Sequence, residues 1–185
     1  MVDEPTPLPP IIPGVARALS PLLRRIASGT ESEPGLNTYL VGIDEIVIVD
    51  PGPDDAAHLD IIVGCGGDRI RWITMTDTHP SYSAGAQRLK ELTGAEIIAP
   101  AGFGVADDLL GDGYKIDATE FRITAIAQTE DRHCFVLEQE RTLIVGDHLE
   151  SSVPDGLRDA VKSYRLKAIA PGHGQYIDNA KAVLG

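Results

Sequence analysis

Residues 37–53 read NTYLVGIDEIVIVDPGP, two short apolar runs followed by a turn. The runs at 38–41 and 46–49 have the length of strands and are rich in aromatic and β-branched residues. The Asp-Pro-Gly sequence at 50–52 stops the second run, because proline lacks an N–H group and glycine favours turns. The stretch therefore predicts two buried strands, the second of which ends in a tight loop.

Helix-like and strand-like runs alternate after this turn. We expect a helix that begins with Asp54 as its cap and Asp55 as an acid in its first turn. A buried strand at 70–75 and a second helix at 83–92 follow, and Gly94 ends that helix.

The second half of the chain carries the same mixture of elements. In chain order we expect a strand at 97–98, strands at 121–127, 133–138 and 142–145, a helix at 155–163, a strand at 168–170, and a terminal helix that holds Ile177, Ala180 and Val183. Strands that alternate with helices in each half, around a hairpin-rich middle, indicate sheets covered by helices.

The amino-terminal region is less regular. Residues 1–13 are rich in proline and are expected to form an extended arm. A single domain is expected at 14–185, a length that can bury a stable core. The run at 15–28 fits either an amphipathic helix or a strand followed by a loop, and the sequence leaves this choice open.

The composition argues against several classes of function. The chain has 28 acidic and 16 basic residues, for a formal net charge of -12. Nucleic-acid binding depends largely on lysine and arginine that displace counterions, so no nucleic-acid partner is expected. Cys65 and Cys134 show no C-x-x-C spacing, which argues against both a disulfide framework and a cysteine zinc site.

The sequence also shows no targeting signal. The first ten residues lack the basic start and long apolar run of a secretory signal, and no apolar stretch reaches the roughly 20 residues of a membrane span. We therefore expect a cytoplasmic protein, no membrane partner, and a small-molecule substrate or ligand. The oligomeric state stays open, with a homodimer as one option.

Polar side chains follow the ends of several expected strands. Asp77 and His79 follow the strand at 70–75, Gln128 follows the strand at 121–127, and Asp147 and His173 follow two later strands. Strand ends hold loop side chains towards a common crevice, so these residues are expected to converge.

Four motifs carry a resemblance to a known family. They are NTYLVG at 37–42, VDPGP at 49–53, GDH at 146–148 and PGHG at 171–174. In order and spacing they resemble the metallo-β-lactamase superfamily, most of all its small hydrolases related to glyoxalase II and the β-lactamase-like-2 proteins. The resemblance spans residues 37–174 and implies an α/β (α+β) fold, a metallo-β-lactamase-type αββα four-layer sandwich.

The same resemblance exposes changes in the metal-binding motif. The family carries T-H-x-H-x-D-H-x-x-G, and this chain reads TDTHPSYSAG in the same place. Asp77 therefore falls on the first histidine and His79 keeps the second. Ser81 and Tyr82 fall on the aspartate and the last histidine, where they are expected to fill space as polar side chains.

The remaining ligand positions are only partly retained. By resemblance, Gln128 falls on the histidine of a T-P-G-H loop, Asp147 on the carboxylate that bridges two metals, and His173 on the last histidine of the second site. The first site would keep Asp77, His79 and Asp147. Catalytic zinc usually takes three protein ligands and an open position, so the resemblance implies at most one zinc, iron or manganese ion, or none.

Each candidate residue also has a structural alternative. Asp77 has the form of a turn aspartate that accepts bonds from neighbouring amides. Asp147 is favoured as a former metal position, and the alternative is a buried aspartate that pairs with His79 or His173. Asp50 resembles a second-shell aspartate that orients a metal ligand, but an Asp-Pro-Gly turn explains it as well.

Two functions follow from these readings. One is a hydrolase of small esters, thioesters or lactones with a one-metal site on Asp77, His79 and Asp147, in which Asp147 and His79 are catalytic and His173 assists. The alternative is a catalytically inactive scaffold, or a module of the same fold that binds a ligand or partner. With several ligands replaced, the sequence favours impaired or absent hydrolysis over a competent two-metal enzyme.

Overall fold

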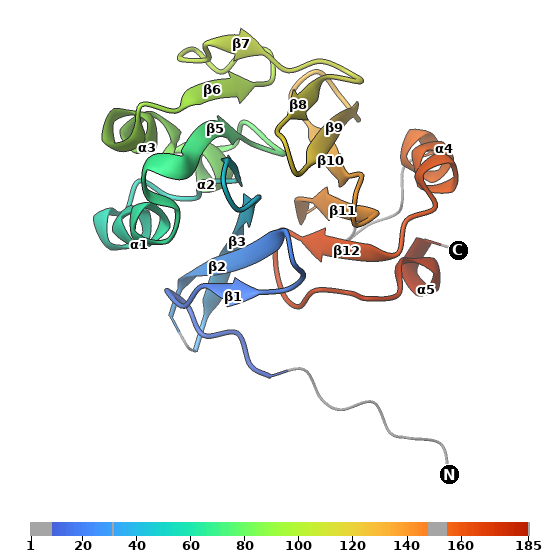
Figure 1. Ribbon diagram of the computed structural model, residues 1–185, viewed down its shortest axis with the longest axis horizontal. Helices are drawn as coiled ribbons and strands as arrows, with labels where there is room; N and C mark the ends of the chain where they lie inside the picture. Colours follow the sequence, from blue (N-terminus) through green and yellow to red (C-terminus); the bar gives the residue numbers. More distant parts are fainter. Residues whose placement is uncertain (1–8, 31, 148–154, 185) are drawn as a thin grey trace.

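The computed structural model describes residues 9–30, 32–147 and 155–184. Two β-sheets pack face to face at the centre, with helices α1 (Ala56–Gly66) and α3 (Ala86–Thr93) outside one sheet and α4 (Asp155–Tyr164) and α5 (Ala180–Leu184) outside the other (Figure 1). The predicted four-layer αββα sandwich is confirmed.

The first sheet has seven strands in sequential order. They are β1 (Arg17–Ala18), β2 (Leu23–Gly29), β3 (Pro34–Val41), β4 (Ile46–Val49), β5 (Ile70–Thr74), β6 (Glu96–Ala99) and β7 (Asp108–Leu109). Strands β1 to β4 pair antiparallel, and β4 to β7 pair parallel. The run at 15–28, which the sequence left open, is not helical: it forms the antiparallel pair of β1 and β2, with bends at 19–22 between them.

The second sheet has five strands in the order β12-β11-β10-β9-β8. They are β8 (Lys115–Asp117), β9 (Arg122–Ala127), β10 (His133–Leu137), β11 (Thr142–Val145) and β12 (Ala168–Pro171). All pairs are antiparallel except β11 and β12, which run parallel. The carboxyl ends of β11 and β12 therefore lie side by side.

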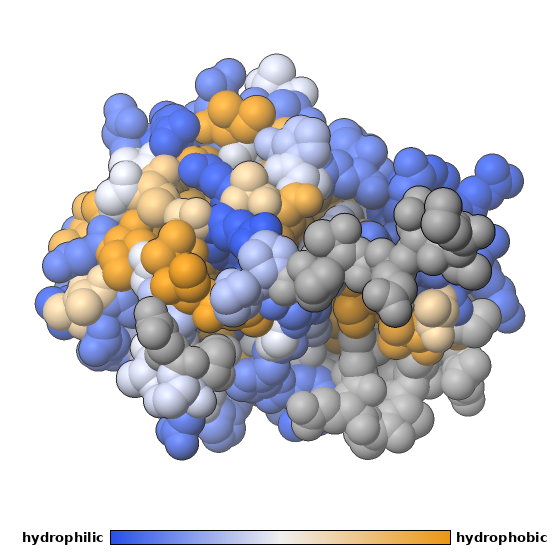
Figure 2. All heavy atoms as spheres, turned by 90° about the horizontal axis from the view of Figure 1, so that it is seen from below, coloured by the Kyte–Doolittle hydropathy of each residue, from blue (hydrophilic) through white to orange (hydrophobic). Residues whose placement is uncertain are grey.

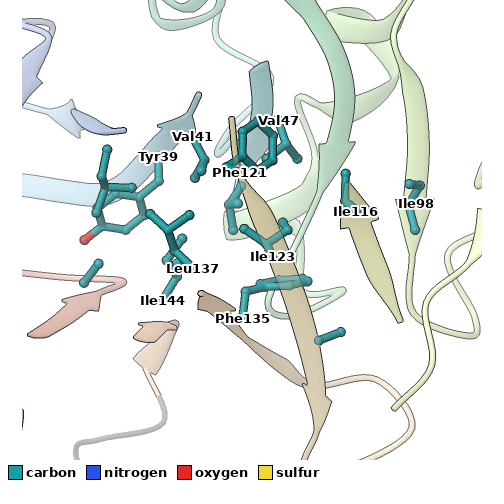
Figure 3. Packing of buried hydrophobic residues seen from close by; sticks show 14 of the residues in the cluster. Tyr39, Val41, Val47, Ile98, Ile116, Phe121, Ile123, Phe135, Leu137 and Ile144 are labelled. Carbon is teal, nitrogen blue, oxygen red and sulfur yellow. The ribbon is translucent and has the colours of Figure 1, made fainter. Parts of the chain in front are cut away.

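Side chains of both sheets form the central core. Tyr39, Phe121 and Phe135 are its largest fully buried members, and Figure 3 shows them between β3, β9 and β10. Phe121 also meets Trp72 edge to face, with ring centroids 6.4 Å apart. Two further cores lie under α1 and α3 and under α4 and α5, so that each sheet is buried on both faces.

The structure corrects three expectations about helices. Asp55, rather than Asp54, caps α1, because its carboxylate accepts a hydrogen bond from His58 N at 2.8 Å. The helix expected at 83–92 begins only at Ala86, as α3, and Ser83 is the last residue of a separate short helix, α2 (Pro80–Ser83). A 3₁₀ turn, η1 (Gly67–Arg69), follows α1. Ile177 lies outside α5, since its backbone pairs with Ile169 of β12.

The amino-terminal segment from Pro9 onward lies across the edge of the first sheet. Gly14 N donates to Ala27 O at 2.9 Å, and Gln175 Nε2 donates to Pro9 O at 2.9 Å. On the face shown in Figure 2, apolar side chains gather in several small patches among polar ones. Within the described residues, no helix has the length and apolar character required to cross a membrane.

Candidate active site

A pocket of about 880 Å³ opens at the carboxyl ends of β5, β9, β11 and β12. Its lining includes every pocket residue expected from the sequence: Asp77, His79, Ser81, Tyr82, Gln128, Asp147 and His173. Ser28, Gly35, Leu36, Pro53, Thr129 and Arg132 complete the wall. The expected convergence is therefore present in the fold.

Asp50 lies beneath this pocket rather than in its wall. The residue is fully buried and left-handed, with φ of 56°. Its carboxylate accepts hydrogen bonds from Thr76 N at 2.6 Å and from Thr76 Oγ1 at 2.9 Å. Burial raises the pKa of Asp50 to about 7. Asp50 thus ties the turn after β4 to the first residues of the loop after β5.

Two further buried side chains support the same turn. Thr38 Oγ1 donates to Asp50 O at 2.7 Å and lies 3.0 Å from His58 Nε2. The His58 ring packs below Gly52, where an added Cβ would lie 3.2 Å from Nε2. Burial lowers the pKa of His58, which favours the neutral ring at neutral pH. The turn is therefore held by a buried polar network.

Asp77 is already paired within the protein. Its Oδ2 lies 3.0 Å from Arg132 Nε, and its Oδ1 accepts a hydrogen bond from His79 N at 2.7 Å. The Asp77 side chain is 10% exposed, so the carboxylate side of this ion pair is largely shielded from water. The backbones of Asp77 and Arg132 also form an antiparallel bridge. Both carboxylate oxygens of Asp77 are thus engaged.

Asp147 has a partner as well. Its Oδ1 lies 3.1 Å from His173 Nε2, and both side chains are partly exposed to the pocket. The loop that carries His173 is anchored by Asn37, whose Nδ2 donates to Pro171 O at 2.9 Å and to Gly174 O at 3.0 Å. The structural alternative in which Asp147 pairs with His173 therefore matches the observed geometry.

The remaining site residues make local contacts. His79 Nδ1 accepts a hydrogen bond from Ser81 N at 3.2 Å and so caps α2. Gln128 Nε2 donates to Cys134 Sγ at 3.0 Å. The Tyr82 hydroxyl is buried and has no well-aligned hydrogen-bond partner in the described part of the chain. Burial, with Asp147 nearby, raises the pKa of Tyr82, so its phenol is protonated.

Comparisons with known structures agree with this architecture. The diiron chemotaxis sensor ODP is similar over 92% of this chain and 93% of its own, with a TM-score of 0.71 and 17% identity. A metallo-β-lactamase family protein from Thermus thermophilus is similar over 90% and 78%, with a TM-score of 0.68 and 16% identity. The chain has the metallo-β-lactamase fold. At these identities the likeness establishes the fold alone.

Comparison of sequences gives a relative at low identity. The atrochrysone carboxyl ACP thioesterase of Aspergillus fumigatus is 24% identical over 184 residues, covering 87% of this chain. This chain spans 58% of the length of that curated relative. No family model matches the sequence.

A two-metal centre does not fit the side chains of this metallo-β-lactamase fold. Three of the ligand positions inferred by resemblance hold Ser81, Tyr82 and Gln128, whose neutral side chains are poor ligands for a dication. Asp77 and Asp147 are occupied by internal partners. Within residues 9–30, 32–147 and 155–184, no three His, Cys, Asp or Glu side chains are grouped so as to hold a metal. His148, which follows Asp147 in the GDH motif, lies outside the described residues.

Arg132 is a pocket residue that the sequence did not single out. It directly precedes β10, and it is the only arginine or lysine in the described lining of the pocket. The available sequence signal was a single cation in the acidic loop before β10, together with an aspartate, Asp77, at the first histidine position of the family motif. His58 was also missed, because nothing in the helix pattern distinguishes a ring that supports a turn from an ordinary helix side chain.

Proposed function

We propose that this pocket binds a small carbonyl compound, such as an ester, thioester or lactone, with little or no two-metal hydrolysis. The Arg132–Asp77 ion pair is the observation that carries the proposal. A guanidinium beside the first ligand position neutralises the carboxylate and repels a dication that approaches it. In this chain the arginine supplies the positive charge that a metal would otherwise supply.

The polar groups of the pocket suit a ligand with a carbonyl oxygen. Arg132 Nε is paired with Asp77, and the terminal nitrogens of Arg132 form no hydrogen bond with another described residue. The Arg132 side chain is 53% exposed, so these donors face water or a ligand. Tyr82 lines the same wall, but its hydroxyl is buried within the protein. Fixed donors around a partly apolar cavity are the usual means of orienting a small ligand.

The test combines metal analysis with a substrate panel on untagged protein. We expect at most about one metal equivalent per chain, since only the first site keeps three candidate ligands. We also expect slow turnover of p-nitrophenyl acetate, acetyl thioesters and lactones, unchanged by EDTA. Binding of a non-hydrolysable ketone analogue should weaken in the Arg132→Ala variant. The control is Arg88→Ala, which removes a surface arginine paired with Asp54 and should leave binding unchanged. Two tightly held metals with rapid, EDTA-sensitive hydrolysis would contradict the proposal.

A one-metal hydrolase is the second candidate. It is supported by the shared pocket of Asp77, His79, Asp147 and His173 and by the thioesterase identity of the distant relative. In this interpretation a zinc, iron or manganese ion would have to draw together Asp77, His79 and Asp147, which are not grouped as ligands in the described structure, with catalytic roles for Asp147 and His79. Addition of Zn²⁺, Fe²⁺ or Mn²⁺ to metal-free protein would then raise thioester hydrolysis, and Asp147→Ala would abolish the increase. A cytoplasmic location accompanies both candidates as a prediction.

A further inference from the structure

A second pocket, of about 710 Å³, lies at the opposite end of the second sheet. Its walls are the turn before β11, the junction between α4 and β12, and the start of α5. The first pocket is at the carboxyl ends of β11 and β12, whereas this one is at their amino ends. Its cationic lining residues are Arg141, Lys162, Arg165, Lys167 and Lys181.

The charge of this pocket is opposite to that of the chain. Five of the chain's 16 basic residues line it, and Asp178 is its one acidic residue within the described part of the chain, although acids outnumber bases 28 to 16 overall. None of the five cations forms an ion pair with a carboxylate of a described residue. Like charges gathered in a concave site create a local positive potential that attracts anions.

Two of the cations are held in a backbone conformation that usually belongs to glycine. Arg141 has φ of 53° and Arg165 has φ of 50°. Among the described residues, Asp50 is the one other non-glycine residue with positive φ, and it supports the first pocket. Arg165 directly follows α4, and the position after a helix is commonly occupied by glycine. Strained residues of this kind collect at functional sites, so the arginines point to a role beyond the turn.

Backbone hydrogen bonds join the wall segments of the pocket, and its floor is apolar. Lys167 N donates to Arg141 O at 2.8 Å, and Ala180 N donates to Lys167 O at 2.8 Å, which joins the three wall segments. Leu166, Ala180 and Leu184 are buried members of the core below α4 and α5 and also line the pocket. Cations therefore stand around an apolar base in a preformed cavity.

We propose that this second pocket binds a small organic phosphate with at least two negative charges. Its phosphate groups would contact the five cations, because guanidinium and ammonium groups are the usual protein partners of phosphate oxygens. Its apolar part would lie on Leu166 and Leu184. The cavity volume lies within the range of about 300–1,000 Å³ typical of small-molecule sites. The chain's net charge of -12 would repel a long nucleic-acid backbone.

Calorimetry on the full, untagged chain tests this proposal with ATP in EDTA and with inorganic tripolyphosphate, at constant ionic strength. We expect both to bind, with ATP tighter because its base contacts the apolar floor. Lys162→Glu with Lys181→Glu should weaken ATP binding on the order of tenfold or more. The control, Arg71→Glu with Lys115→Glu, makes the same change in net charge on exposed residues of β5 and β8, and should leave binding within about twofold.

Two further variants test whether the second pocket, and not the first, binds the phosphate. Arg132→Ala, in the first pocket, should leave ATP binding unchanged. Arg165→Gly should weaken ATP binding while it keeps or raises the melting temperature, because glycine relieves the left-handed strain. The proposal is overturned if ATP does not bind, if the control pair loses as much affinity as the pocket pair, or if Arg165→Gly binds as tightly as the parent.

Discussion

Asp77 stands where, by resemblance, the hydrolases of this fold carry a neutral histidine ligand, and the change brings a negative charge into the pocket wall. A carboxylate that is 10% exposed requires a partner, because an unpaired buried charge is costly. Arg132 supplies that partner at 3.0 Å, and the backbone bridge between the two residues fixes the approach. The aspartate at this position thus accounts for the guanidinium that lies beside it.

Removal of Arg132 should therefore reopen the position to a metal. We expect Arg132→Ala to raise the affinity for Mn²⁺ or Zn²⁺ by about tenfold, because Asp77 regains a free oxygen and the repulsion is gone. Its cost in stability should be about 1 kcal/mol, since the arginine is half exposed. Isothermal titration of metal into both proteins measures the change. Equal metal affinity in parent and variant would mean that Arg132 does not control the site.

Asp50 should make stability depend on pH. Burial raises its folded pKa to about 7, above the ordinary value of 3.8. A raised carboxyl pKa contributes stability that is fully present below the unfolded pKa and lost as pH rises through the folded pKa. From pH 8 to 5.5 the parent should therefore gain about 2 kcal/mol relative to Asp50→Asn, which cannot titrate. Urea unfolding of both proteins at the two pH values tests this, and parallel pH profiles would contradict it.

At the scale of elements, uninterrupted apolar runs are predicted well. The strands expected at 46–49 and 142–145 are confirmed as β4 and β11, because both faces of each strand are buried. Strand β7 was missed, since its two residues are exposed and it forms only by pairing with β6. Ile177 was placed in a helix because its spacing fits one, but its pairing with Ile169 determines its conformation.

The break between α2 and α3 depends on close packing at Gly85. An added Cβ there would lie 2.9 Å from both Leu59 Cδ2 and Pro53 O, and Gly85 N donates to Gly52 O. We expect Gly85→Ala to destabilise the protein by about 1–3 kcal/mol, because backbone must shift. Gly64→Ala, in α1 with open space around it, should instead stabilise by about 0.5–1 kcal/mol. Thermal unfolding of both variants checks the contrast, and equal shifts would refute it.

For the whole molecule, the order of motifs was enough to predict the sandwich and the convergence of the ligand positions. The charge state of the pocket could not be predicted in the same way. It depends on Arg132, which is far from Asp77 in sequence and meets it only through the packing of the two sheets. The basic pocket was likewise invisible, because its five cations come from three separate segments of an acidic chain.

This dependence on the assembled fold decides how a dimetal site could be rebuilt. Asp77→His, Ser81→Asp, Tyr82→His and Gln128→His restore the ligand types of the family, but they leave Arg132 without its carboxylate and beside the metals. We therefore expect the fourfold variant to bind less metal than a fivefold variant that adds Arg132→Ala, which should approach two equivalents and hydrolyse an activated ester faster. Single changes should do little, because ligands that act as a unit are not additive. Metal analysis and ester hydrolysis, with circular dichroism to verify folding, compare parent, fourfold and fivefold proteins. If a folded fivefold variant binds no more metal than the parent, the backbone around the pocket, and not the ion pair of Asp77 and Arg132, prevents metal binding.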